Sequence, residues 1–192
     1  MDSPTVLSLL VGTGLAAACG FRVFVPLLVM SVAARAGHLQ LSPGFDWIAS
    51  GPALIAFAAA TVLEIAGYFI PYVDHVLDVL AAPAAAVAGT LVTASAVIGM
   101  SPFLRWTLAI IAGGGVAVLF HAATGAARAA STATTGGLAN PAVAVAEAGG
   151  STLLSVLAIA APVLALAGII VIVLLAGRVL RAARARISRG SS

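Results

Sequence analysis

Charge is what this sequence lacks most: only 8% of its 192 residues are charged, and there is no lysine among them. A water-soluble domain carries about 25% charged residues and about 45–50% apolar ones, whereas 62% of this chain is hydrophobic. This small number of charges cannot cover a surface that faces water. We therefore expect the protein to be surrounded by lipid, with membrane lipids as its partners. The single Cys19 excludes an intrachain disulfide.

Sequence motifs of known enzyme families are also missing. The sequence contains no G-x-S-x-G, no H-E-x-x-H, no Walker A loop and no dinucleotide fingerprint. We therefore expect no enzyme activity and no cofactor. The arginine-rich C-terminal tail has no aromatic residues between its arginines, which argues against nucleic-acid binding.

Long hydrophobic runs predict an all-α, polytopic transmembrane bundle of about five spans, because each run reaches the roughly 20 residues that cross a bilayer core. The expected helices cover residues 5–35, 51–70, 76–99, 103–129 and 151–178. Residues 1–178 form this bundle, and residues 179–192 form an arginine-rich cytoplasmic tail.

Two stretches depart from this pattern. A single helix over 5–35 would be about 46 Å long, and it contains Gly20 and Pro26, so we expect it to be kinked or broken. The segment 131–148 is too polar to span and too apolar for an exposed loop. It is either a re-entrant loop or an interfacial helix, and such breaks can aim helix termini at a substrate.

Five of the nine arginines lie in the last fifteen residues, which places the C-terminus in the cytoplasm by the positive-inside rule. Five spans then put the N-terminus outside and bring Arg35 and Arg105 to the cytoplasmic side. This orientation predicts that most polar groups inside the bundle gather in its outer half.

Ionisable residues inside apolar runs are costly, so they tend to pair and to mark functional sites. Glu64, with Tyr68 one turn further along the same helix face, could bind a cation or proton, or could neutralise Arg22 or Arg128. His121, Thr124 and Arg128 follow one another at helical spacing and could share a polar stripe. A lone histidine is a weak metal signal, so the identity of any metal stays open.

The remaining candidate ligands belong to the predicted outer connections. Asp74 and Asp78 are four residues apart and could share a cation through their oxygens, although Asp74 could equally cap the third helix. Asn140 and Glu147 complete the set of candidate substrate- or ion-binding residues.

Several segments resemble the DUF4126 family of bacterial membrane proteins. The resemblance rests on residues 20–27 (GFRVFVPL), 43–48 (PGFDWI), the stretch from Glu64 to Asp78, and residues 135–141 (TGGLANP) with Glu147. It implies a helical protein of the bacterial inner (plasma) membrane and adds no activity. Asn is expected where this chain has Arg22, so ligand specificity at that position need not be shared with the family.

Three functions remain open. The first is a small transporter or permease for a small molecule or ion, with its site in the outer-half polar cluster. The second is a non-transporting module, either an assembly factor or a lipid-binding protein. The third is a channel formed by a homo-oligomer, because five short spans enclose little space alone.

Overall fold

The computed structural model describes the backbone of residues 3–189; the side chains of residues 71–76, 78, 175–176 and 179–189 lie outside this description. It is all-helical, without strands in the described part, which confirms the predicted fold class. The helices are α1 (Ser3–Phe21), α2 (Phe24–Arg35), α3 (Gly51–Gly67), α4 (Pro71–Ala96), α5 (Pro102–Leu108), α6 (Gly115–Thr135), α7 (Asn140–Ala160) and α8 (Pro162–Arg189), with a 3-10 helix η1 (Asp46–Ala49) and a π-helical turn η2 (Ala109–Gly114) that joins α5 to α6.

Four helices are long and apolar enough to cross a membrane, namely α1, the later part of α4, the continuous α5–η2–α6 rod and α7. Shorter apolar helices, α2, α3 and the first part of α8, lie beside them. Their outward residues are large and apolar: Phe103 is 82% exposed and Ile55 71%. This surface suits lipid and not water.

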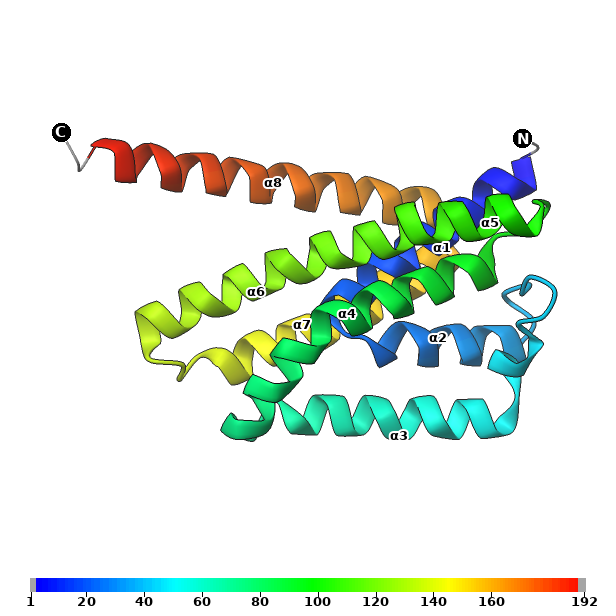
Figure 1. Ribbon diagram of the computed structural model, residues 1–192, viewed down its shortest axis with the longest axis horizontal. Coiled ribbons are helices and arrows are strands. Elements are labelled where there is room, and N and C mark those ends of the chain that lie inside the picture. The colour runs from blue at the N-terminus through cyan, green and yellow to red at the C-terminus, as the bar shows by residue number, and fades with distance from the viewer. Residues whose placement is uncertain (1–2, 190–192) are drawn as a thin grey trace.

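The first predicted span is broken, as expected, and the break reverses the chain. α1 runs away from the end that holds the N-terminus, and α2 returns toward it (Figure 1). Pro26 explains the interruption, because within a continuous helix its ring would clash with the carbonyl of residue 22. As the third residue of α2 it lies in a first turn, where no amide hydrogen is needed.

The predicted helix 151–178 also consists of two antiparallel pieces. α7 ends at Ala160, Ala161 has non-helical angles (φ −147°, ψ 71°), and Pro162 begins α8. Residues 131–148 are the end of α6, a turn, and the start of α7, so they are not a separate segment between two helices. Gly136 and Gly137 make that turn with positive φ values of 62° and 88°, the left-handed conformation that commonly ends a helix.

The two additional reversals change which charged residues share an end of the bundle. Arg35 donates to the carbonyl of Ala49 at 3.0 Å and Arg105 contacts the Ser42 hydroxyl, so both lie beside the 36–50 connection. That connection is at the N-terminal end, whereas α8 ends at the opposite end (Figure 1). The expectation that Arg35 and Arg105 share a side with the C-terminal arginines is therefore wrong.

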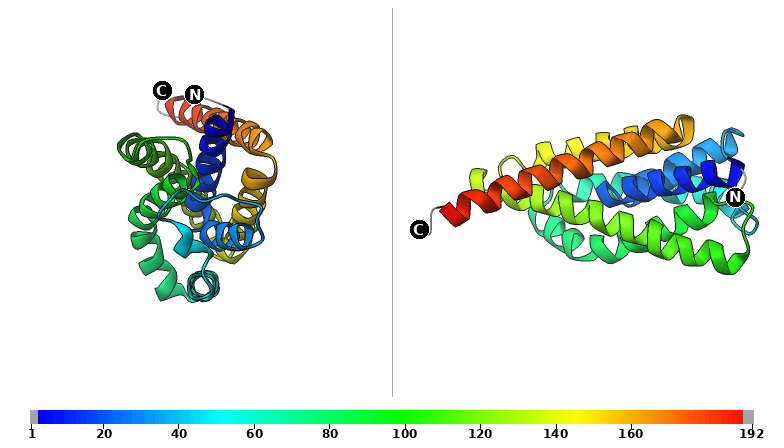
Figure 2. Two further views of the ribbon diagram at one scale, coloured as in Figure 1. Left: turned by 90° about the vertical axis from the view of Figure 1, so that its right-hand side faces the viewer. Right: turned by 90° about the horizontal axis from the view of Figure 1, so that it is seen from above.

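α1 lies among the other helices and forms much of the core (Figure 2). Residues 15–20 are all buried, and α4, α6, α7 and α8 each pack on α1. Small residues permit this close packing: a Cβ added to Gly20 would lie 2.4 Å from the Phe120 Cβ. This approach holds the end of α1 against α6, next to the polar site described below.

Candidate functional site

The break between α1 and α2 carries a buried arginine. Arg22 is 1% exposed, and its Nη2 donates to the Ala144 carbonyl at 2.9 Å and lies 3.1 Å from Glu147 Oε2. Glu147 also binds Arg128, which donates from Nε to Oε1 at 2.9 Å and from Nη2 to Oε2. One carboxylate from α7 thus serves two guanidinium groups, and burial of charge among apolar helices requires such pairing.

Tyr68 joins both arginines from the end of α3. The guanidinium carbon of Arg22 lies 3.8 Å from the centre of its ring, and that of Arg128 lies 4.1 Å from it. An aromatic face attracts a cation, by about 2 kcal/mol or more when the pair is desolvated. The ring therefore ties α3 to the charged cluster formed by the end of α1, α6 and α7.

The direct ion pairs of Arg22 and Arg128 are with Glu147, and the charge of Glu64 acts on Arg22 from a greater distance. The two carboxylate oxygens of Glu64 accept the backbone amides of Val23 at 2.7 Å and Phe24 at 3.0 Å. These amides open α2, and the first amides of a helix have no partner within it. A carboxylate there satisfies them and interacts favourably with the positive end of the helix dipole. Glu64, 8% exposed, is thus the cap of α2, supplied by α3.

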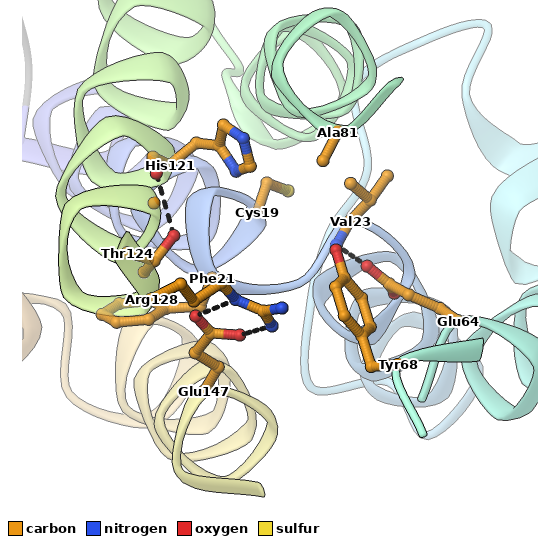
Figure 3. A pocket seen from close by; sticks show the side chains of 11 residues that line it. Cys19, Phe21, Val23, Glu64, Tyr68, Ala81, His121, Thr124, Arg128 and Glu147 are labelled. Atoms are coloured by element: carbon orange, nitrogen blue, oxygen red, sulfur yellow. Dashed lines mark hydrogen bonds and ion pairs between the residues drawn. The ribbon is translucent and has the colours of Figure 1, made fainter. Parts of the chain in front are cut away.

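A cavity of about 120 Å³ lies between these groups (Figure 3). The interior of the bundle is thereby hollow beside its charged cluster, with room for water. Its lining comes from α1, the α1–α2 break, α3, α4, α6 and α7: Cys19, Phe21, Val23, Glu64, Tyr68, Ala81, His121, Thr124, Gly125, Arg128 and Glu147.

His121, Thr124 and Arg128 line this cavity from one face of α6. The Thr124 hydroxyl donates to the His121 carbonyl at 2.9 Å, so its hydrogen is used within the helix. The His121 ring, Cys19 and the Arg128–Glu147 pair face the same space (Figure 3).

The other predicted residues are placed differently. Asn140 donates from Nδ2 to the Thr132 hydroxyl at 3.1 Å and fastens the α6–α7 turn, away from the cavity lining. Asp74 and Asp78 belong to the first two turns of α4, and their side chains lie outside the described residues. Within the described part, no group of three His, Cys, Asp or Glu side chains is arranged to hold a metal ion.

The cluster lies in the half of the bundle where α8 ends, which corrects its expected depth. Arg128 is seven residues before the end of α6 and Glu147 seven after the start of α7, or about 10 Å from the α6–α7 turn. The C-terminus of α8 lies at this same end (Figure 1). Prediction placed the cluster opposite the arginine tail because it read α7 and α8 as one crossing.

Sequence reasoning missed the Arg22–Glu147 and Arg128–Glu147 pairings and the capping role of Glu64. The signal available was the presence of four ionisable residues, two of each sign, inside apolar segments where each needs a partner. Which carboxylate meets which arginine depends on helix packing, since Arg22 and Glu147 belong to segments far apart in sequence. The contributions of Cys19, Phe21, Val23, Ala81 and Gly125 had no such signal.

These features define a class. The chain is an α-helical bundle of the membrane-protein type, with a paired ionic cluster and a small polar cavity near one end. The model of the family described as "Domain of unknown function (DUF4126)" matches residues 9–182, and the chain belongs to that family. No curated protein and no solved structure matches it.

Proposed function

We propose that this protein is a small transporter or permease of the bacterial inner membrane, and that its substrate passes through the cavity between Tyr68, Arg128 and Glu147. The observation that carries the proposal is a polar cavity at the tip of an interrupted helical hairpin, enclosed by apolar helices. Discontinuous helices at buried binding sites are a recurrent feature of secondary transporters, where helix termini contact the substrate.

The lining of the cavity suits a substrate with polar groups. Its ionisable side chains are costly at this depth, and such residues commonly mark substrate or proton pathways. The cavity, about 120 Å³ in volume, accommodates a small ion or one polar headgroup, and a larger solute would require the helices to move apart. α3 is suited to move, because it packs mainly on α2 and contacts α4 only sparsely.

For the orientation we propose an external N-terminus and a cytoplasmic C-terminus. Five of the nine arginines follow residue 177, and basic residues near the ends of spans favour the cytoplasm. The site then lies in the inner half of the membrane. A reporter that is active only outside the membrane, fused to either terminus, tests this: activity at the C-terminus would reverse the orientation.

Transport is testable in proteoliposomes that contain the full chain. Uptake is measured for radiolabelled inorganic phosphate, acetate and dodecyl phosphate, with empty liposomes as background. Arg128→Lys keeps the charge but loses the two-pronged bond to Glu147, and we expect uptake to fall at least about tenfold. Arg35→Lys, the same change at an exposed position at the other end, should leave uptake unchanged. Absence of protein-dependent uptake for every solute, or equal uptake by both variants, would contradict the proposal.

One observation favours the non-transporting module instead. Every carboxylate oxygen of Glu64 and Glu147 already accepts a hydrogen bond, as expected for a cluster that serves only to hold the bundle together. In that case Arg128→Lys lowers thermal stability in detergent, and no solute shows protein-dependent uptake. An oligomeric channel would instead give discrete conductance steps in single-channel recordings.

A further inference from the structure

A second hollow adjoins the polar cavity. It is a groove of about 660 Å³ between α3 and α4, and its lining is apolar apart from the polar groups at its inner end. Leu63, Ile70 and Leu80, along its rim, are 71%, 52% and 57% exposed. The groove therefore opens sideways, toward the lipid that covers this face, and not toward water.

The groove and the cavity share a wall. Val23, Glu64, Tyr68 and Ala81 line both spaces. A molecule in the groove would thus place one end beside the charged cluster while the rest contacts only apolar side chains. From Ala60 to Gly67 the groove follows α3 for seven residues, or about 10 Å, and it continues past the end of the helix to Ile70. This elongated shape suits a flexible chain better than a compact solute.

Hydrogen-bonding capacity indicates the chemistry of the polar end. Arg22 stacks on Tyr68 and contacts Glu147, two residues that line the cavity, yet its Nε and Nη1 have no hydrogen-bond partner although the side chain is 1% exposed. By contrast, both oxygens of Glu64 and of Glu147 already accept donors. Spare donors beside occupied acceptors favour a ligand that brings acceptors, and guanidinium groups match carboxylate and phosphate geometry.

We propose that this site takes an anionic amphiphile with a single alkyl chain, whose tail lies in the α3–α4 groove and whose acidic head enters the cavity beside Arg22 and Arg128. The inference rests on the proposed transport function, because it names the substrate class of the same site. The head lies beside Tyr68 and Glu147, which line the cavity and contact Arg22, whereas Arg22 itself is not part of the lining. The tail stays in the groove.

The test is photolabelling of the full chain in phosphatidylcholine nanodiscs with a dodecyl phosphate that carries a diazirine on its chain. Labelled peptides are mapped by mass spectrometry. We expect labels on the groove faces of α3 and α4, displaced by unlabelled dodecyl phosphate. Neither inorganic phosphate, which lacks the tail, nor dodecyltrimethylammonium, which carries the opposite charge, should displace them at the same concentration.

Two variants separate the head from the tail. Arg22→Asn removes the donors and should weaken competition by dodecyl phosphate about tenfold, the loss of one charge-assisted hydrogen bond. Ala84→Phe fills the groove at a distance from the charges and should reduce labelling similarly, which keeps the test decisive if Arg22→Asn does not fold. Val87→Phe on the same helix, 70% exposed and outside the groove, is the matched control.

Displacement by inorganic phosphate alone, equal displacement by the cationic amphiphile, or equal labelling of the Ala84→Phe and Val87→Phe variants would overturn the inference. The proteoliposome assay distinguishes this failure from that of the proposed function. Uptake of phosphate or acetate without groove labelling would support transport and refute the amphiphile as its substrate. Specific groove labelling without any uptake would support the amphiphile site and refute transport.

Discussion

Glu147→Gln is the substitution that tests the ionic cluster most directly. Glu147 is 6% exposed, accepts two hydrogen bonds from Arg128 and forms an ion pair with Arg22. The amide has nearly the same shape as the carboxylate but no charge, and it offers one acceptor oxygen in place of two. Both guanidinium groups then lose the carboxylate to which they are paired.

Two scales bound the magnitude. Removal of one partner of a buried ion pair costs about 3–5 kcal/mol in soluble proteins. Hydrogen bonds within membrane helices average only about 0.6 kcal/mol each, because the unfolded chain in the bilayer also finds partners, so the two from Arg128 amount to about 1 kcal/mol. We therefore expect the free energy of unfolding to fall by about 1–5 kcal/mol.

Reversible unfolding of the purified protein in mixed micelles measures this change. Asp46→Asn is the matched control, because Asp46 is an exposed carboxylate at the other end of the bundle and its loss should cost less than about 0.5 kcal/mol. The single variant Arg128→Met and the double variant Glu147→Gln/Arg128→Met complete a double-mutant cycle. Because the double variant also removes a guanidinium group that Glu147 binds, its loss of stability should be at least about 1 kcal/mol smaller than the sum of the losses of the two single variants.

A Glu147→Gln protein whose stability is within about 0.5 kcal/mol of the original would refute the reasoning, as would strict additivity in the cycle. Either result would mean that the two arginines do not depend on this carboxylate.

Three further predictions follow from the packing around the cluster. Glu64→Ala removes the cap of α2 and should cost about 1–2 kcal/mol, with faster hydrogen exchange at the first two amides of that helix and unchanged exchange in α6. Gly20→Ala forces a Cβ to within 2.4 Å of the Phe120 Cβ and should cost about 1–3 kcal/mol in thermal unfolding, whereas Gly115→Ala, with open space at its Cβ, should be neutral or slightly stabilising. Tyr68→Leu keeps apolar bulk but loses the ring beneath both guanidinium groups, so unfolding should become easier by about 1–2 kcal/mol; Phe at the same position should restore most of the loss.

The sequence was sufficient for the class and for most helix edges, since apolar run length and Pro or Gly punctuation are local properties. It also indicated that the first long run could not be one straight helix. It did not reveal that the chain reverses direction between α1 and α2 and again between α7 and α8. A proline in an apolar run is compatible with either a kink or a reversal, and the choice depends on what the new helix packs against. At Pro26 the reversal is supported by Glu64, whose carboxylate accepts hydrogen bonds from the backbone amides at the start of α2.

The same limit applies to the site. Glu64, Tyr68, Arg22, His121 and Arg128 are candidates because they are ionisable or polar within apolar segments, and Glu147 because it belongs to a predicted outer connection. The structure brings all six together. Which of these residues pair with one another could not be predicted from the sequence, because the pairing depends on which helix faces meet. The error in depth had a single cause, the unrecognised turn at Ala161.

The cap of α2 by Glu64 has a consequence for how the chain is made. α2 has twelve residues, about 18 Å of helix, and cannot span a hydrocarbon core of about 30 Å. The amides at its start are satisfied by the side chain of Glu64, which leaves the ribosome forty residues after Phe24. α2 is therefore not stable in the lipid until α3 has been synthesised and inserted. The order of biogenesis is thereby constrained: α1 can enter the bilayer alone, whereas α2 and α3 must settle as a pair.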